Sequence, residues 1–454
     1  MSNNYLIIGS GAAGLAAAQS IRKNDPTANV QIVTAETTGY YSRPGLAYYL
    51  AREIPRSQLF PLAEEYFREI GLKFIFKRTV EILPEQRQIC LEDQQLLSYD
   101  RLLIACGASA QRPNLAGINC TNVVTLDSMA DADHICKLAR KGKTAVVIGG
   151  GITALELVEG LHAHGMKVQY LLRGERYWGA VLDDIESKIV ERRLEEQGVT
   201  IRRNTQLIGI FCQHEHVRSI QVETKGKAEQ IQCGLLAMAI GIRPRVELAK
   251  RADLAVKRGI LVDEFLQSSH ADIFAAGDVA ETRDPISHEY TLDSLWGPAI
   301  EMGTIAGMNM TGQQVAYRKL MPFNVTRLAG LVTTIIGQVG KNAPRTAAVN
   351  NDLDLPGIMR GDSETWRILP DGEVAQTYQG DNRLRLYIQH NLIRGALVMG
   401  DQTLSYPLQR LIREEIDINE IHHQLLQPGA TLHAIISQFW QDYTRRSHAI
   451  PAFH

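Results

Sequence analysis

The sequence predicts an α/β protein in which two doubly wound units with parallel sheets are followed by an α+β region. Three observations support this prediction. A strand-type run, a glycine-rich turn and a run of helix formers follow one another within residues 5–23. The same order recurs within residues 144–172. From about residue 316 onward, short β-type runs alternate with polar turns instead, at residues 323–330, 331–340, 383–389 and 392–400.

The composition is that of an ordinary globular protein. With 454 residues, 45% of them hydrophobic and 22% charged, the chain has room for about three domains. A net charge of −2 predicts no nucleic-acid partner. The first five residues lack Lys and Arg, so we expect no secretion signal. The longest apolar run, roughly nine residues, is less than half of the ~20 that a membrane helix needs, so we expect a cytoplasmic protein that does not associate with membranes.

The cysteines are scattered along the chain. No two of the six stand at CxxC or CxxxxC spacing: Cys90, Cys106, Cys120, Cys136, Cys212 and Cys233. This pattern fits a reducing compartment and argues against a metal knuckle and a local redox disulfide. Histidines at metal-ligand spacing are also missing, so we expect no metal site.

The first glycine turn has the residues that a dinucleotide pyrophosphate requires. Gly9 follows the run Tyr5–Ile8 and makes the tight turn, while Gly11 lets a pyrophosphate touch the backbone. Gly14 allows the next helix to pack closely on the strand, and the free N–H groups of that helix face the phosphates. The following strand-type run ends in Glu36, an acid that can bind a ribose. We therefore expect a bound dinucleotide here.

The second glycine turn repeats the first. Gly149, Gly151 and Ala154 stand at the three positions of the pattern, again between a strand-type run and a helix. Glycines that merely end strands might explain one such turn, but both turns have the correct flanking elements. Two turns of this kind imply two dinucleotides.

The second turn differs from the first where its second strand ends. The acid expected there is replaced by Leu172, which is followed by Arg173 and then Arg176. An acid would bind a free ribose 2′-hydroxyl and repel a 2′-phosphate, so its absence beside arginine favours NADPH. Glu175 lies between the arginines, which leaves NADH open.

Three further segments extend the pattern: YDRLLIACGASAQRP at 99–113, AIGIRP at 239–244 and GILVDEFLQSSHADIFAAGDVAE at 259–281. With the two glycine turns, they resemble the FAD-dependent pyridine nucleotide-disulfide oxidoreductase superfamily over about two-thirds of the chain. The resemblance implies two cofactors, FAD and NADPH or NADH. The first segment departs from the family because its usual Thr is Cys106, which we interpret as a small buried thiol.

The resemblance implies an interrupted architecture. The fold class is α/β, with two Rossmann-like dinucleotide-binding domains (FAD and NAD(P)H) and an α+β C-terminal interface domain. The FAD-binding domain comprises residues 1–112 and 245–315, and the NAD(P)H-binding domain comprises residues 113–244. The interface domain covers 316–415, before a helical tail at 416–454. In many members this domain makes a dimer, so we expect a homodimer or larger homo-oligomer.

The family's motifs also imply the residues that contact the cofactors. Asp278 should hydrogen-bond the ribityl chain of FAD. A helix that starts near Pro298 should aim its amino end at the flavin, where negative charge gathers on reduction. Trp296 either lines the flavin pocket or packs in the core. The expected cofactor contacts are Gly9, Gly11, Ala13, Gly14, Glu36, Arg43, Pro44, Val80, Ala105, Gly107, Gly149, Gly151, Ala154, Arg173, Gly241, Gly277, Asp278, Trp296 and Ala299.

The segment ETTGYYSRPGLAYYL at 36–50 indicates the branch of the family. Branches that reduce disulfides or peroxide carry a cysteine here, whereas this chain has Pro44 and Gly45. The string YYSRPGL resembles the loop of rubredoxin reductases, ferredoxin reductases and the flavin module of nitrite reductases. Arg43 would lie near FAD, or else form a surface salt bridge. Because no Cys cluster for an iron–sulfur centre follows, we do not expect a complete nitrite reductase.

These features predict an FAD-dependent NAD(P)H oxidoreductase. It would pass hydride from nicotinamide to flavin, and then electrons to a small redox protein or a small-molecule acceptor. Glu156, on the helix of the second turn, is the expected catalytic residue that orients the nicotinamide, with Glu159 as the surface alternative. Two other functions stay open: a peripheral NAD(P)H:quinone reductase, and a flavoprotein that serves as a binding or sensing subunit.

The tail predicts an amphipathic helix. Six apolar side chains share one helical face: Leu432, Ile435, Ile436, Phe439, Trp440 and Tyr443. This face packs on its own subunit or a partner, covers the acceptor site, or lies on a membrane surface.

Overall fold

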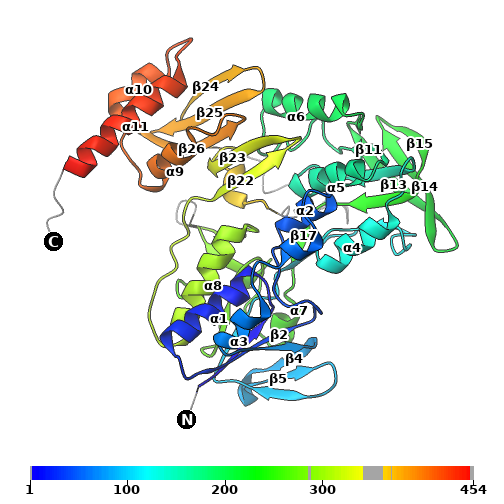
Figure 1. The fold of residues 1–454 in the computed structure, drawn as a ribbon, viewed down its shortest axis with the longest axis vertical. Helices are drawn as coiled ribbons and strands as arrows, with labels where there is room; N and C mark the ends of the chain where they lie inside the picture. The colour runs from blue at the N-terminus through cyan, green and yellow to red at the C-terminus, as the bar shows by residue number, and fades with distance from the viewer. Residues whose placement is uncertain (1–2, 285–287, 341–360, 370, 450–454) are drawn as a thin grey trace. The chain divides into compact units, whose positions relative to one another are not determined.

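A computed structural model describes residues 3–284, 288–340, 361–369 and 371–449 (Figure 1). The described residues form two compact units. The first contains residues 3–175, 198–319 and 361–363. The second contains residues 176–197, 320–340 and 364–449.

The first unit contains a five-stranded parallel sheet built around the first glycine turn. Its strand order is β19-β7-β1-β2-β3, which means Ile273–Ala275, Arg101–Ile104, Asn4–Ile8, Asn29–Thr34 and Leu72–Phe76. Every neighbouring pair in it is parallel. Helix α1 (Ala12–Asn24) follows β1, as the sequence predicts. The central strands are almost fully buried, because their side chains are apolar on both faces.

A second parallel sheet in the same unit surrounds the second glycine turn. Its order is β12-β11-β10-β16-β9, which means Thr200–Arg202, Lys167–Leu171, Thr144–Ile148, Leu235–Met238 and Val123–Val124. Helix α5 (Ile152–Ala163) joins β10 to β11, and α4 (Met129–Leu138) follows β9. An antiparallel sheet adds β13 (Thr205–Gln213), β14 (His216–Thr224) and β15 (Lys227–Gln232).

Shorter elements complete the first unit. The chain passes between the two sheets through a pair of antiparallel strands, β8 (Ala108–Ala110) and β17 (Ile242–Pro244). The other short strands are β4 (Thr79–Leu83), β5 (Gln88–Leu91), β6 (Leu96–Ser98), β18 (Ile260–Leu261), β20 (Ala280–Arg283) and β21 (Tyr290–Thr291). The other helices are α2 (Gly45–Leu50), α3 (Glu64–Glu69), α7 (Glu247–Arg251) and α8 (Trp296–Met310), with 3-10 turns at Arg56–Leu59 and Pro84–Gln86.

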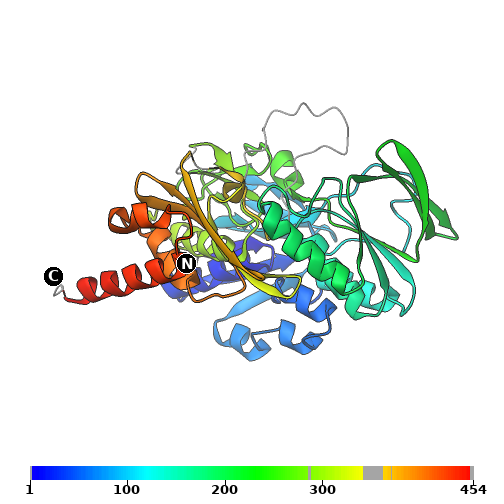
Figure 2. The ribbon, with the colours of Figure 1, turned by 90° about the horizontal axis from the view of Figure 1, so that it is seen from above.

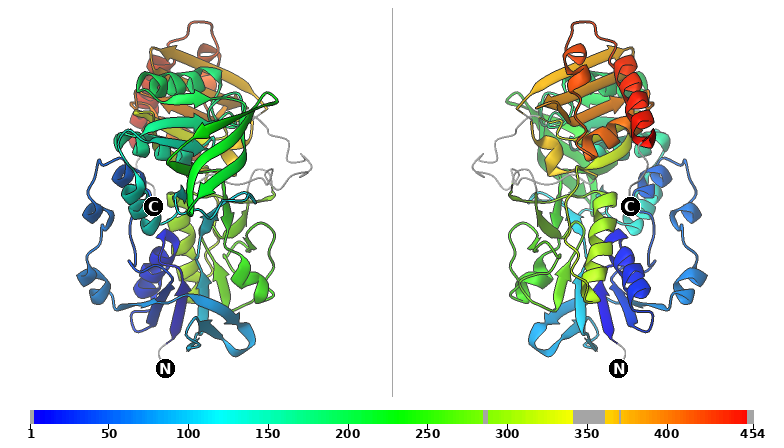
Figure 3. Two further views of the ribbon diagram at one scale, coloured as in Figure 1. Left: turned by 90° about the vertical axis from the view of Figure 1, so that its right-hand side faces the viewer. Right: turned by 90° about the vertical axis from the view of Figure 1, so that its left-hand side faces the viewer.

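Helices α1 and α8 lie side by side (Figure 3). Small residues permit this close packing. A Cβ on Gly303 would lie 2.1 Å from the carbonyl oxygen of Ala13, and one on Gly307 would lie 2.6 Å from that of Ala17. The amino ends of two helices from distant parts of the sequence are thereby fixed relative to each other.

The second unit is a five-stranded antiparallel sheet covered on both faces (Figure 2). Its order is β22-β23-β26-β25-β24, which means Phe323–Leu328, Leu331–Gly337, Leu392–Met399, Asn382–Gln389 and Glu373–Gln379. The sequence predicts four of these strands, while β24 lies outside the predicted runs. Helices α9 (Ser405–Arg413), α10 (Asn419–Leu425) and α11 (Leu432–Ala449) cover one face. Helix α6 (Asp184–Glu196) and the 3-10 turn Glu364–Arg367 lie on the other.

Helix α6 is held to the sheet by a buried ionic network. The Arg385 guanidinium donates to both carboxylate oxygens of Glu186, each at 2.9 Å. Glu186 is fully buried, and burial raises the pKa of its carboxyl group although Arg385 opposes the shift. Nearby, Arg383 donates to Asp183 at 2.6 Å.

The apolar face of the tail packs on its own subunit. Leu432, Ile436 and Phe439 of α11 belong to the same core as strands β25 and β26. Trp440 and Tyr443 are partly buried against that core and stack on each other with ring centroids 5.7 Å apart. The face is therefore not available to a membrane, and that alternative loses its basis. No helix in the described part of the chain is both long and apolar enough to cross a bilayer.

The predicted fold class is confirmed, since the described chain has two parallel sheets with the expected turns and an α+β second unit. The predicted domain boundaries stay predictions. Residues 176–197, which the sequence assigns to the NAD(P)H-binding domain, group here with the second unit.

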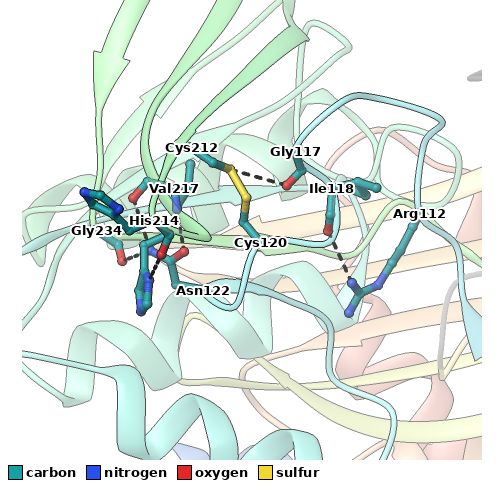
Figure 4. The surroundings of a disulfide bond; sticks show 10 residues. Arg112, Gly117, Ile118, Cys120, Asn122, Cys212, His214, Val217 and Gly234 are labelled. Atoms are coloured by element: carbon teal, nitrogen blue, oxygen red, sulfur yellow. Dashed lines mark hydrogen bonds between the residues drawn. A yellow bond between two sulfur atoms is a disulfide. The ribbon is translucent and has the colours of Figure 1, made fainter.

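A disulfide joins Cys120 to Cys212 (Figure 4). The two residues are 92 positions apart, so no local spacing indicates the pair, and the sequence analysis, which considered only local disulfides, did not predict this bond. The bond links the segment before β9 to strand β13. Asn122, in the same segment before β9, exchanges side-chain hydrogen bonds with Val217 of β14 and donates to the carbonyl of Gly234 at 2.7 Å.

Candidate cofactor site

The first glycine turn has the geometry of a phosphate cradle. Gly9 has a φ of 116°, and a Cβ there would lie 2.2 Å from the carbonyl oxygen of Ala105. A Cβ on Gly14 would lie 2.0 Å from the carbonyl oxygen of Gly9. Helix α1 starts at Ala12 without a side-chain cap and without an acid in its first turn. Its first N–H groups therefore have no partner in the helix and suit an anion.

Three motifs that are distant in the sequence meet beside this turn. Gly277 adopts a φ of 78°, and a Cβ there would lie 3.1 Å from the Cβ of Ala13 and 3.8 Å from that of Ala299. The start of α1, the Gly277–Asp278 turn and the first turn of α8 thus come together. This is the arrangement that the expected FAD contacts require.

Arg43 lies at the same place but has protein partners. It pairs with the carboxylate of Glu36 and donates to the carbonyl of Asp127 at 2.7 Å. Its guanidinium also lies 5.1 Å from the ring centroid of Tyr41. Burial alone would lower the pKa of Arg43, but Tyr41, Glu36 and Asp278 together raise it. A Cβ on Gly11 would lie 4.0 Å from Nε of Arg43, so the cation is close to the cradle.

Tyr41 is a residue that the sequence interpretation missed. Its hydroxyl accepts a hydrogen bond from the backbone N–H of Met129 at 3.1 Å, and burial raises the pKa of that hydroxyl. With Arg43, it connects the 36–45 segment to the start of α4. Tyrosine beside arginine was visible in the sequence, but its partner 88 residues away was not.

Three further residues that the sequence offers as FAD contacts are Pro44, Val80 and Trp296. Pro44 precedes the first residue of helix α2. Leu50, the last residue of α2, packs against α5, because a Cβ on Gly160 of α5 would lie 2.4 Å from the Cγ of Leu50. Val80 is the extra residue of a β-bulge in β4, and its carbonyl accepts from Arg251 at 2.7 Å. Trp296 is 50% exposed, so it is not core packing, and its indole N–H donates to Tyr40.

The second glycine turn is similar in geometry. Gly149 has a φ of 148°, and a Cβ there would lie 2.2 Å from the carbonyl oxygen of Ala239 and 2.9 Å from the Cβ of Ala154. Gly151 caps α5, again without a side-chain hydrogen bond. Glu156 and Glu159 are both half-buried on α5. Gly107 and Gly241 lie at opposite ends of the two crossing strands, since Arg245 donates to the first and Gln111 to the second through backbone bonds of 2.9 and 2.8 Å.

The sequence offers Arg173 and Arg176 for a 2′-phosphate, and the two arginines differ in their surroundings after the end of β11. Leu172 is buried and donates its backbone N–H to Arg202, whereas Arg173 is exposed. Arg176 is ion-paired with Asp184 ahead of α6, so it no longer counts as a second phosphate contact.

The unpaired cysteines in the described chain are not built for nucleophilic chemistry. Burial raises the pKa of Cys106 to about 11 and that of Cys233 to about 12. The Cys106 thiol donates to the carbonyl of Arg245 at 3.3 Å. Burial also raises the pKa of Cys136. The described residues include no group of three or more His, Cys, Asp or Glu side chains that could hold a metal ion.

Comparisons with known proteins agree with the two dinucleotide sites described above. The family model described as pyridine nucleotide-disulphide oxidoreductase matches residues 3–303. A rubredoxin-NAD(+) reductase of Ectopseudomonas oleovorans is 30% identical over 314 residues, which is 68% of this chain and 78% of that protein. An NADH oxidase of Methanocaldococcus jannaschii is 29% identical over 336 residues, 72% of this chain and 74% of that protein.

A solved structure supports the fold across almost the whole chain. The covalent putidaredoxin reductase–putidaredoxin complex contains a chain with a TM-score of 0.81 and 21% identity, covering 96% of this chain and 98% of that one. At this identity the likeness concerns the fold alone. Both glycine turns leave the space and the free N–H groups that FAD and NAD(P)H require, and the protein is an FAD-dependent NAD(P)H oxidoreductase. The chain belongs to the pyridine nucleotide-disulphide oxidoreductase family.

Proposed function

We propose that this oxidoreductase takes electrons from NADPH and delivers them to a small redox protein of the rubredoxin or ferredoxin type. When bound, FAD supplies the chemistry that accepts an electron pair and releases it singly or in pairs. The observation that carries the proposal is the 36–50 segment, which presents Arg43, Pro44 and Gly45 where a thiol would otherwise receive the electrons. Because burial raises the pKa of Cys106 and of Cys233, neither thiol suits the role of electron acceptor, and we propose that the acceptor comes from outside.

The chain's own residues would bind and orient the two cofactors. The amino ends of α1 and α5 would each bind a pyrophosphate, while Asp278 would hydrogen-bond the ribityl chain. Glu36 holds Arg43 in place beside Gly11, where the guanidinium offsets phosphate charge. Glu156, one turn into α5, would orient the nicotinamide. The other residues expected to contact FAD or NAD(P)H would have the roles that the family implies.

The preference for NADPH rests on the end of β11. Leu172 provides no carboxylate for a ribose 2′-hydroxyl, and exposed Arg173 is the nearest residue in sequence that can meet a 2′-phosphate. The rubredoxin reductase and the NADH oxidase above are named for NAD(+) and NADH. The proposed preference for NADPH therefore differs from the coenzymes in their names.

Anaerobic mixing with NADPH tests the half-reaction, and an acceptor panel tests the rest. The flavin absorbance should bleach within seconds, and rubredoxin or ferredoxin should then reoxidise the protein faster than menadione or oxygen. Absence of bleaching with both nicotinamides would indicate a binding or sensing flavoprotein instead. Faster turnover with oxygen or menadione than with either redox protein would contradict the proposed acceptor.

We also propose that the protein works as a homodimer in the cytoplasm. Among the residues that the structure describes, strand β24 pairs only with β25, which leaves one edge of the second sheet open to them, and Val374 and Tyr378 on it are 45% and 65% exposed. An open edge with apolar side chains suits a second copy of the chain. Light scattering coupled to gel filtration should give twice the monomer mass; a monomer at all concentrations would contradict this.

A further inference from the structure

A buried ionic cluster stands beside the proposed flavin contacts without serving the mechanism above. The side chain of Lys319 is 2% exposed. Its Nζ donates to Oγ1 of Thr291 at 2.5 Å and lies 3.1 Å from Asp293 and 3.4 Å from Asp284. Both carboxylates are almost fully buried. A lone cation buried between two carboxylates is expensive to desolvate and needs a reason beyond packing.

The cluster also holds a second segment. Ser363 donates its hydroxyl to Asp293, and the two residues form an antiparallel β-bridge. Next to it, the backbone N–H of Ser294 donates to the carbonyl of Asp362 at 3.1 Å, and that of Gly361 donates to Ser294 at 3.1 Å. Residues 361–363 are thereby tied to the two residues that lie just before α8.

The location of the cluster points to its role. The described residues between Asp278 and α8 include Asp284, Thr291 and Asp293, which are the three partners of Lys319. The same 361–363 segment also reaches the second cradle, because a Cβ on Gly361 would lie 3.7 Å from Cδ1 of Ile152, the first residue of α5. Lys319 thus contacts described residues on the path from Asp278 to α8, the two elements that are expected to contact the flavin.

We propose that Lys319 is a positioning residue for the flavin: through Asp293 and Ser363 it fixes the amino end of α8. The inference rests on the proposed role of α8, whose positive end faces the flavin edge that becomes negative on reduction. A helix end stabilises such a charge only over its first turn, so a small displacement weakens the effect. Loosening the cluster should therefore lower the reduction potential of the bound flavin.

Reduction potentials of FAD-loaded variants, measured by dye titration, test the proposal. Lys319→Met should make flavin reduction up to about tenfold less favourable, which is the size of a helix-end effect. Lys319→Arg should retain the wild-type potential. Ser363→Ala removes no charge and should shift the potential in the same direction as Lys319→Met, by a smaller amount. The KM for NADPH should stay the same.

Controls separate positioning from stability and from plain charge. Arg385→Met disrupts the buried network of the second unit, and it should lower the Tm without moving the potential. If Lys319→Met shifts the potential and Ser363→Ala does not, the effect is long-range charge and the proposal is wrong. Unchanged potentials in both variants would also overturn it. If the wild-type protein binds no FAD, the proposed function itself fails.

Discussion

At the scale of the residue, the proposed preference for NADPH depends on Arg173. It is exposed at the end of β11, whereas Arg176 is occupied by Asp184. Arg173→Glu should repel a 2′-phosphate and accept a hydrogen bond from a 2′-hydroxyl, so the NADPH/NADH ratio of kcat/KM should fall at least tenfold, or about 1.4 kcal/mol. Steady-state kinetics with both coenzymes measures this ratio.

The matched control for this prediction is Arg176→Gln. Because Arg176 is ion-paired with Asp184, that variant should change the ratio by no more than about fivefold, which corresponds to the roughly 0–1 kcal/mol of an exposed ion pair. An unchanged ratio in Arg173→Glu would remove Arg173 from the phosphate site, and an equal change in both variants would mean that the local fold rather than the charge is responsible.

Gly14 tests the first cradle at the same scale. A methyl group there would lie 2.0 Å from the carbonyl oxygen of Gly9, so Gly14→Ala must push α1 away from β1. Overpacking of this kind costs about 1–3 kcal/mol, and we expect the purified variant to retain little FAD. Gly234→Ala is the control, because its Cβ would meet nothing closer than 3.8 Å. Normal flavin content in Gly14→Ala would contradict the assigned role.

At the scale of the element, the Cys120–Cys212 bond ties strand β13 to the segment before β9. Closing a loop of 92 residues restricts the unfolded chain by up to about 4–5 kcal/mol in the chain-entropy description. Reduction with dithiothreitol should therefore lower the Tm. Cys212 is exposed, so a cytoplasmic reductant should reach it.

The double variant Cys120→Ser/Cys212→Ser is the test of that effect. It should show the lower Tm from the start and no further response to dithiothreitol, while retaining the fold because Asn122 still bonds the segment before β9 to Val217 and Gly234. Cys106→Ser serves as the control and should remain sensitive to dithiothreitol. A Tm that dithiothreitol does not change in the wild-type protein would show that the bond adds nothing to stability.

Elements with a strong local pattern could be predicted, and those that depend on tertiary pairing could not. Both glycine turns, helices α1, α5, α8 and α11, and four strands of the second sheet follow from periodicity and turn chemistry. Strand β24 is an edge strand with only one buried side chain, Ala375, so its sequence lacks an alternating pattern. The Arg43–Glu36 pair joins two residues that the sequence assigned to separate tasks. The Lys319 cluster includes a hydrogen bond between Ser363 and Asp293, which are 70 residues apart, and no motif marks them.

At the scale of the whole molecule, the two compact units have separate cores. The largest core of the first unit involves residues between Tyr5 and Tyr317, and that of the second involves residues from Ile336 onward. Both dinucleotide cradles belong to the first unit. FAD binding should therefore stabilise one unit directly and the other only through their coupling.

Removal of FAD measures that coupling. A ligand at 1,000 times its Kd stabilises the state that binds it by about 4 kcal/mol. The apoprotein should therefore unfold in two calorimetric transitions, whereas the holoprotein should unfold in one transition or in two that lie closer in temperature. The lower transition should return to the holoprotein position when FAD is added back. Ile436→Ala identifies the other transition, because it removes a fully buried side chain from the second core at a cost of about 2–5 kcal/mol. If removal of FAD and Ile436→Ala shift the same single transition, the two units unfold as one cooperative body, and the separate cores do not act as independent units of stability.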